Sequence, residues 1–174
     1  ERNSVFIQAR EGGSISAIYG RGFQRVEDPS SEYFGQKIVN SNGIPIRTDG
    51  LVYQGDYAPD YTLGILNSFK YKSLDLGFMF DIRQGGIVVS RTKTIGSTSG
   101  QLKETLVGRE TGIVAEGVVE TSPGVYTPNT TNVDVRTYNN RYYERDNVEA
   151  AKYDASYTKL REVSMGYTLP AKII

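Results

Sequence analysis

Two neighbouring stretches of the chain alternate between apolar and polar residues with a period of two. Over residues 61–71 the odd positions are apolar apart from Asn67, and the even positions are small or polar apart from Leu66. Over residues 74–82 the apolar side chains fall on the even positions, apart from Met79. Successive side chains of a β-strand point to opposite faces, so this pattern predicts two strands, each with one apolar face and one polar face.

A very short connection joins these two stretches. Only Lys72 and Ser73 separate them. The apolar positions change from odd to even across this pair, and a two-residue hairpin turn keeps both apolar sets on the same side of the sheet. The sequence therefore predicts antiparallel strands near residues 61–72 and 74–84, joined by a tight hairpin.

The spacing of four tyrosines indicates strands long enough to cross a membrane. Tyr61 and Tyr71 lie ten residues apart, as do Tyr157 and Tyr167 in a third predicted strand over residues 156–169. In a strand tilted by about 45° each pair would share one face, with its rings separated by about 24 Å in height. Outer-membrane barrels carry an apolar band of about 25 Å between two aromatic girdles. Strands of soluble proteins are usually only about five or six residues long.

The third predicted strand carries two cations that do not suit an apolar face. Lys159 and Arg161 occupy odd positions, like Tyr157 and Tyr167. A cation on the lipid face costs up to about 2–4 kcal/mol at the centre of the bilayer. Two interpretations stay open. The cations reach the phosphates of lipopolysaccharide at the extracellular side, or a β-bulge near Leu160 exchanges the two faces.

The remaining connections are long. Residues 22–60 and 85–155 are rich in glycine, proline and turn-forming pairs. We predict that both are irregular, with one weak helical turn at residues 144–153. Two short strands are expected before them, at residues 5–10 and 14–19. Outer-membrane barrels combine short periplasmic turns with long extracellular loops. A periplasmic hairpin turn would place both long segments outside the cell.

Composition narrows the possible functions. The 20 Lys and Arg residues balance the 20 Asp and Glu residues, which gives no electrostatic reason to expect a nucleic acid as partner. The absence of cysteine and histidine removes thiolate nucleophiles, zinc–sulfur sites and the commonest general base. We therefore expect no enzyme activity, no cofactor and no metal site. The negative mean hydropathy favours a soluble β-sandwich, although a barrel with a hydrated interior also has a polar wall.

Two blocks of the sequence resemble a known family. They are PDYTLGILNSFKYKSLDLGFMFDIRQGG at residues 59–86 and YDASYTKLREVSMGYTLP at residues 153–170. Both resemble the C-terminal barrel region of the SusC/RagA family, which are TonB-dependent outer-membrane transporters of Bacteroidetes. GGSISAIYGRGFQ at residues 12–24 is similar to a family block more loosely. The resemblance implies an all-β fold, with the antiparallel up-and-down strands of an outer-membrane β-barrel. Residues 1–174 would then be a fragment of the C-terminal barrel domain, a partial barrel with long extracellular loops and no plug domain.

The resemblance also implies a function and partners. Members of this family import oligosaccharides or peptides across the cell outer membrane, and a SusD-like surface lipoprotein covers the extracellular mouth. The implied role of this chain is to form barrel wall, in contact with outer-membrane lipid, together with extracellular loops. Contact with the TonB complex would come through a missing N-terminal part. Barrels of this kind have about 22 strands, so transport would need more than these residues. The alternative is a soluble, tyrosine-rich β-sandwich that binds carbohydrate.

The alternation assigns the two faces within such a barrel. Residues expected to point to lipid are Leu63, Ile65, Phe69, Leu76, Phe78, Phe80, Val163 and Met165. Residues expected to point to the lumen are Thr62, Gly64, Ser68, Asp75, Gly77, Asp81 and Ser164.

Aromatic and basic residues gather in the second long segment. Five are candidate contacts with a partner or substrate: Tyr126, Tyr138, Arg141, Tyr142 and Tyr143. Arg136 and Arg145 lie close to them in the sequence. Tyrosine and arginine are enriched at protein interfaces, and a tyrosine ring offers a flat apolar face with a polar end. The alternative is that these rings only pack the long loop against its neighbours.

Overall fold

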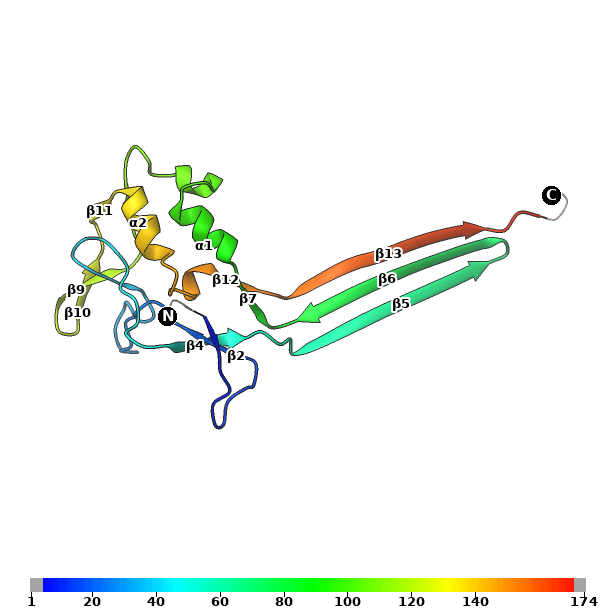
Figure 1. The fold of residues 1–174 in the computed structure, drawn as a ribbon, viewed down its shortest axis with the longest axis horizontal. Helices are drawn as coiled ribbons and strands as arrows, with labels where there is room; N and C mark the ends of the chain where they lie inside the picture. The colour runs from blue at the N-terminus through cyan, green and yellow to red at the C-terminus, as the bar shows by residue number, and fades with distance from the viewer. Residues whose placement is uncertain (1–4, 171–174) are drawn as a thin grey trace. The chain divides into compact units, whose positions relative to one another are not determined.

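The computed structural model describes residues 5–170, which divide into two compact units. The sheet unit comprises residues 56–88 and 154–170, and the loop unit comprises residues 5–55 and 89–153. Each unit is therefore assembled from two segments that lie far apart in the sequence (Figure 1).

Three long antiparallel strands form the sheet unit. β5 (Tyr61–Tyr71), β6 (Leu74–Gln84) and β13 (Tyr157–Tyr167) each have 11 residues and lie in the order β13-β6-β5 (Figure 1). The three strands predicted from the alternating pattern are confirmed, to within two residues at each end. Within residues 5–170 the sheet is open and forms no closed barrel, because β5 and β13 are both edge strands.

The connection between β5 and β6 is the expected tight hairpin. Tyr71 pairs with Leu74, and the register continues unbroken to Tyr61 opposite Gln84. Lys72 has a φ of 54°, in the left-handed region that two-residue hairpin turns require. Lysine adopts this conformation less easily than glycine or asparagine, so the length and pairing of the strands, and not the turn residues, fix this hairpin.

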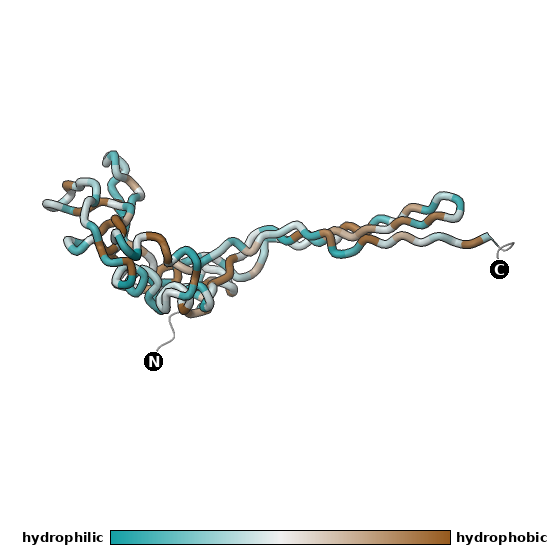
Figure 2. Tube along the Cα trace, turned by 90° about the horizontal axis from the view of Figure 1, so that it is seen from above, coloured by the Kyte–Doolittle hydropathy of each residue, from teal (hydrophilic) through white to brown (hydrophobic). Residues whose placement is uncertain are grey.

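The sheet has one apolar face and one polar face. Leu63 lies opposite Ile82, and Val163 lies opposite Phe78. All residues expected to point to lipid share this apolar face, and all those expected to point to the lumen share the other. Figure 2 shows the alternation of hydropathy along the strands. The apolar face is uncovered, since Val163 is 63% exposed and other residues of this face are also exposed. Its assignment to lipid stays a prediction.

A β-bulge interrupts the third strand. The pairing of β13 with β6 shifts between Leu160 and Glu162, so Arg161 is an extra residue. One extra residue inverts the alternation. As a result Tyr157 lies opposite Arg83 on the polar face, whereas Tyr167 lies on the apolar face. The expectation that Tyr157 and Tyr167 share a face is therefore wrong, and the bulge interpretation is confirmed.

The bulge also gives both cations of β13 polar surroundings. Lys159 pairs with Asp81 on the polar face. Arg161 donates from Nε and Nη2 to Asp81 Oδ2, at 2.8 and 2.6 Å. Tyr157 donates its hydroxyl to the same oxygen at 3.2 Å. No cation of this strand has to be placed on the apolar face.

The loop unit contains short strands and short helices. Its strands are β1 (Phe6–Ile7), β2 (Ala17–Gly20), β3 (Ile38–Val39), β4 (Val52–Asp56), β8 (Ile113–Val114), β9 (Val118–Ser122), β10 (Val125–Pro128) and β11 (Asn132–Val133). Its helices are α1 (Arg91–Thr98) and α2 (Val135–Tyr142), with the 3₁₀ turns η1 (Lys103–Leu106) and η2 (Glu149–Ala151). β7 (Ile87–Val89) and β12 (Lys152–Asp154) lie where the chain passes from one unit to the other.

The loop unit has a small core built from both of its segments. Three small sheets run in the orders β1-β2-β4, β10-β9-β3 and β11-β8. The largest fully buried apolar side chains are four valines, Val26, Val39, Val118 and Val148. Two of them precede β5 in the sequence and two follow β6. The two long segments therefore fold together as one body.

The two α-helices correct the prediction of an irregular second segment with one helical turn. α1 has the sequence RTKTIGST, whose threonines, glycine and serine are poor helix formers. It begins at Ser90, which accepts a hydrogen bond from the backbone N–H of Lys93, and it packs against α2. The turn expected at residues 144–153 is present only as η2. No helix of residues 5–170 is long and apolar enough to cross a membrane.

Candidate functional site

α2 carries most of the candidate contact residues. Asp134 caps its first turn, where Oδ1 accepts a hydrogen bond from the backbone N–H of Thr137 at 2.9 Å. This hydrogen bond lowers the pKa of Asp134 from its usual value. The cap fixes the start of the helix, so Tyr138 and Tyr142 lie one turn apart on the same side.

Three rings of α2 and its C-terminal end form a tyrosine cluster, defined as Tyr138, Tyr142 and Tyr143. The ring centroids of Tyr138 and Tyr142 are 5.2 Å apart and stacked, and those of Tyr142 and Tyr143 are 5.0 Å apart at a steep angle. Phe23 packs on Tyr142 with a centroid distance of 4.7 Å. These rings therefore connect the second long segment to the first.

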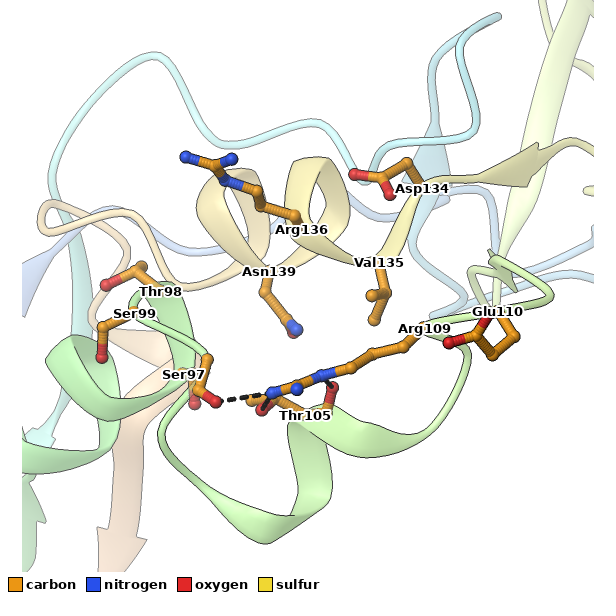
Figure 3. A pocket seen from close by; sticks show the side chains of 11 residues that line it. Ser97, Thr98, Ser99, Thr105, Arg109, Glu110, Asp134, Val135, Arg136 and Asn139 are labelled. Atoms are coloured by element: carbon orange, nitrogen blue, oxygen red, sulfur yellow. Dashed lines mark hydrogen bonds between the residues drawn. The ribbon is translucent and has the colours of Figure 1, made fainter.

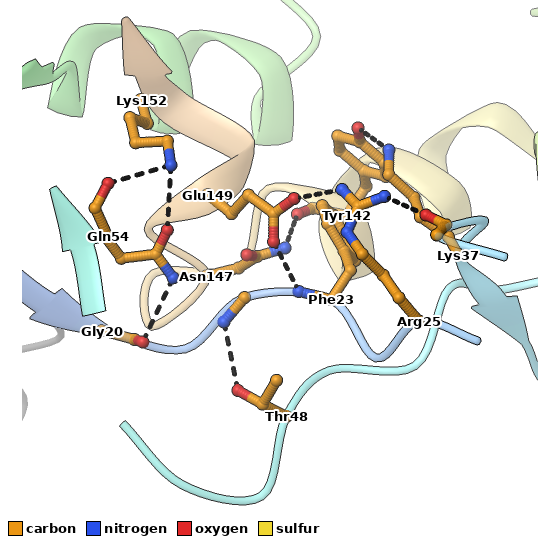
Figure 4. Close-up of polar contacts among 12 residues, drawn as sticks. Gly20, Phe23, Arg25, Lys37, Thr48, Gln54, Tyr142, Asn147, Glu149 and Lys152 are labelled. Carbon is orange, nitrogen blue, oxygen red and sulfur yellow. Dashed lines mark hydrogen bonds and ion pairs between the residues drawn. The ribbon is translucent and has the colours of Figure 1, made fainter. Parts of the chain in front are cut away.

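Lys37 binds the cluster from the other long segment. Its Nζ donates a hydrogen bond to the hydroxyl of Tyr142 at 2.7 Å, and it lies 4.5 Å from the ring centroid of Phe23 (Figure 4). A cation over an aromatic face contributes about 0.5–1 kcal/mol at exposed sites and more when water is excluded. Lys37 thus holds the first segment against α2.

Two phenols of the cluster, those of Tyr138 and Tyr143, have a raised pKa. Burial raises the pKa of Tyr138 far above its ordinary value, and the neighbouring Tyr142 adds to the effect. Burial also raises the pKa of Tyr143. Tyr138 and Tyr143 therefore offer neutral rings and hydroxyl groups near pH 7.

A second set of contacts, the loop seam, joins residues 20–54 to residues 142–152. Glu149 lies at its centre (Figure 4). Its Oε2 accepts a hydrogen bond from the backbone N–H of Phe23 at 2.8 Å, and its Oε1 accepts one from Arg25 Nη2 at 2.5 Å. Because Phe23 is buried, this carboxylate supplies the partner that its N–H cannot obtain from water.

Further contacts extend the loop seam on both sides. Arg47 pairs with Asp146 and, at 3.0 Å, with Glu144. The backbone N–H of Val148 donates to the carbonyl of Arg21 at 3.0 Å. These bonds fix the register between two segments that are about 100 positions apart. They offset the entropy cost of bringing such distant segments together.

A glycine allows the close approach at the centre of the loop seam. A Cβ on Gly22 would lie 2.6 Å from Glu149 Oε2 and 3.0 Å from Gln54 Nε2. Lys152 Nζ completes this part of the loop seam by donating to the carbonyl of Gln54 at 2.9 Å. The GRG sequence around Gly22 therefore serves packing within the loop unit.

A polar cavity of about 650 Å³ opens beside α2 (Figure 3). It lies among the end of α1, η1 and the first turns of α2, and its lining includes Ser97, Thr105, Arg109, Arg136 and Asn139. A second hollow of about 250 Å³ is lined by the tyrosine cluster together with Glu104, Thr105, Ile113 and Asn139. Thr105 and Asn139 line both hollows, so the two hollows adjoin.

The structure brings only three of the five candidate residues together. Tyr138, Tyr142 and Tyr143 form the cluster. Arg141 is exposed on the same helix and pairs with Glu144 at 3.7 Å. Tyr126 lies on β10, and no ring contact joins it to the cluster within residues 5–170. Packing against Phe23 shows that at least part of the cluster is structural. A role in partner or substrate contact stays a prediction.

Sequence reasoning missed the residues that hold the cluster in place. Phe23, Lys37 and Glu149 come from distant parts of the chain, and no local pattern connects them. The helix itself had a detectable signal, because Asp134 is a favoured N-cap residue and two tyrosines follow at helical spacing.

The raised pKa of Tyr138 leads to a test at alkaline pH. A group whose pKa is raised on folding contributes stability below its unfolded pKa of about 10 and loses that contribution as the pH rises further. We expect the loop unit to lose stability above about pH 10, and the Tyr138→Phe variant to lose less. The phenolate absorbance of Tyr138 is obtained as the wild-type signal minus the variant signal. It should rise at a higher pH in the folded protein than in the unfolded protein. Equal titration of Tyr138 in both states would contradict the burial of its ring.

Comparison with known proteins gives one informative similarity. No protein-family model matches the chain. The chain is similar to the TonB-dependent receptor P3 of Formosa agariphila, with 27% identity over 181 aligned residues. The alignment covers 95% of this chain but only 16% of that receptor. The similarity therefore extends over both units of this chain and over a small part of the receptor's length.

Proposed function

We propose that this chain is part of a SusC/RagA-like TonB-dependent importer of the outer membrane. In this proposal β5, β6 and β13 form barrel wall, and the loop unit lies at the extracellular mouth. The observation that carries it is the exposed apolar face of three adjoining 11-residue strands. Exposing such a face to water is unfavourable in free energy, whereas contact with the hydrocarbon of a membrane is favourable. The similarity to a TonB-dependent receptor supports the wider part of this assignment, a TonB-dependent receptor, and not the SusC/RagA family in particular.

This proposal also includes the assignment of residues 1–174 to a fragment of the barrel domain without the plug domain. It includes the cargo as well. The cargo would be a glycan or a peptide, and the chain would contribute no catalytic residue. A SusD-like lipoprotein would contact the loop unit, and TonB would act through another part of the receptor. The alternative of a soluble carbohydrate-binding β-sandwich gains no support from the sheet unit, because such a fold would bury the apolar face under a second sheet.

Surface labelling of the full-length protein tests the proposed orientation. An epitope tag inserted at Gly124, in the exposed β9–β10 turn, should be labelled on intact cells. The same tag inserted between Lys72 and Ser73 should be labelled only after the outer membrane is permeabilised. Labelling of both tags in intact cells, or recovery of the protein in the soluble fraction, would contradict the proposal.

Partner capture tests the candidate contact residues that are not part of the packed cluster. Combined replacement of Tyr126 and Arg141 by alanine should weaken lipoprotein capture by about tenfold, because aromatic and arginine side chains dominate interface energy. Replacement of Asn140, an exposed residue of the same helix, serves as the matched control. Capture would be measured by pull-down at equal surface display. Unchanged capture and uptake in the double variant would remove these residues from the proposed interface.

A further inference from the structure

The β-bulge in β13 collects three cations at one end of the polar face, the end where β6 ends and β13 begins. We call them the cation cluster, defined as Arg83, Lys159 and Arg161. Arg83 lies in the first paired row of this face, Lys159 lies in the second, and Arg161 is the extra residue of the bulge. Without the bulge, Lys159 would lie on the same face as Val163. β-Bulges are over-represented next to active sites, where they redirect a side chain.

Two cations of the cluster have no carboxylate partner within residues 5–170. Lys159 Nζ lies 4.1 Å from the ring centroid of Tyr157 and forms no ion pair. Arg83 donates from Nη2 to the carbonyl oxygen of Tyr57 at 2.8 Å, and its buried Nε has no hydrogen-bond partner. Native proteins satisfy most buried N–H groups, so this guanidinium lacks part of its expected hydrogen bonding. The charges of Lys159 and Arg83 are therefore not balanced by an ion pair.

Asp81 is already engaged by the third cation. Its Oδ2 accepts hydrogen bonds from Arg161 Nε and Nη2 and from the hydroxyl of Tyr157. Glu162 follows the bulge on the same face and forms no ion pair within the described part of the chain. These two carboxylates against the three cations leave one positive charge in excess. This end of the polar face therefore favours an anion over a cation or a neutral group.

The cation cluster is open to a ligand. Lys159 is exposed, and half of the Arg161 side chain is exposed. Gly64 lies opposite Asp81 on β5, and a Cβ there would meet only Met79 Cε, at 4.0 Å. The space beside the cluster is therefore not filled by side chains of β5. A guanidinium has five N–H donors, and Arg161 uses two of them on Asp81, so it keeps donors for a second oxyanion.

We propose that the cation cluster binds an oxyanion group, a carboxylate, phosphate or sulfate, that is carried by the imported cargo. The guanidinium donors suit the geometry of such groups, and the ammonium of Lys159 supplies a compact charge beside them. In the proposed barrel this end of the polar face is the extracellular end of the lumen, where cargo arrives. The inference rests on the proposed function for that location, and it adds a negative charge to the description of the cargo.

Binding of matched probes by the full-length protein in detergent tests this inference. Each pair of probes differs only in charge: an oligoglutamate peptide and its oligoglutamine analogue, and an oligouronate and its carboxyl-reduced analogue. We expect the acidic member of at least one pair to bind more tightly than its neutral analogue. The preference should shrink as the salt concentration rises from about 50 to about 500 mM, because salt screens exposed charges.

Variants on the polar face locate the binding. Lys159→Gln should weaken binding of the preferred acidic probe about threefold to fivefold, since it removes the charge of an exposed cation. Lys159→Arg keeps the charge and should retain most of the affinity. Lys70→Gln is the matched control on the same face, because its cation is already paired with Asp75 at 3.4 Å, and it should leave binding unchanged.

Each outcome separates the site from the wider function. No preference for either acidic probe, or equal loss of binding in Lys70→Gln and Lys159→Gln, would overturn the oxyanion site. The site would also be overturned if Lys159→Gln destabilised the unliganded protein and kept the preference, because the cluster would then face another part of the receptor. The proposed importer would survive these results if surface labelling holds. Preference for an acidic probe that depends on Lys159, in a protein that fails surface labelling, would support the site and overturn the importer.

Discussion

The Phe78→Arg variant of the full-length protein is expected to fail to assemble in the outer membrane. Phe78 lies near the middle of β6 on the apolar face, where it packs beside Phe69 and Phe80 at centroid distances of 5.9 and 5.7 Å. Arginine on the lipid face at mid-bilayer costs about 2–4 kcal/mol. Assembly would be measured by the heat-dependent gel mobility of folded barrels and by surface labelling.

Two matched variants separate charge from lost packing. Phe78→Ala removes the ring without adding a charge, so it reports the packing loss alone. Met79→Arg places the same cation on the next residue, whose side chain lies on the polar face. We expect Met79→Arg to assemble normally. Equal failure of the two arginine variants would show that the two faces of β6 do not meet different environments, and the lipid assignment of the apolar face would have to be abandoned.

The Glu149→Ala variant is expected to open the loop unit while leaving the sheet unit intact. It removes the acceptor of the buried Phe23 N–H and the ion-pair partner of Arg25. Loss of a hydrogen-bond partner from a buried group costs about 1–3 kcal/mol, and the lost partner here is also charged. Hydrogen exchange of residues 20–54 and 142–152 should accelerate by one to two orders of magnitude, whereas residues 61–84 should keep their protection.

The conservative variant Glu149→Gln provides the control. Its amide oxygen can still accept from Phe23, so most of the protection should return, and only the charge of the Arg25 contact is lost. Glu144→Ala removes a partly exposed carboxylate at the periphery of the loop seam and should have a small effect. If Glu149→Ala exchanged no faster than Glu144→Ala, the central role of Glu149 would be wrong.

Local patterns predicted the sheet unit because its constraints are local. A period of two over about ten residues specifies both the strand and its faces. The two-residue connection between Tyr71 and Leu74 leaves one pairing that keeps the apolar residues together. The third strand was predicted correctly in position, and its residues after the bulge also in facing, but Tyr157 before the bulge was assigned to the wrong face. The alternation of this strand is interrupted at Arg161. Only the pairing with β6 and the contacts with Asp81 show that the residues before Arg161 follow the opposite alternation to those after it.

The loop unit and the candidate site depend on contacts that no local pattern encodes. Residues 91–98 contain few good helix formers, and α1 forms because Ser90 caps it and because it packs on α2. The tyrosines of α2 were visible in the sequence as an aromatic group. Their support by Phe23 and Lys37 was not visible, since those residues lie more than 100 positions away.

The sequence by itself determined three long strands, their hairpin and the separation of an apolar from a polar face. Alternation along a strand is a property of neighbouring residues, so it is written in the order of the chain. Only the tertiary structure decided the bulge at Arg161, the assembly of the loop unit and the cavity beside Asn139. These features arise where distant segments meet, and their stability comes from pairing, burial and hydrogen bonds that exist only after the chain has folded.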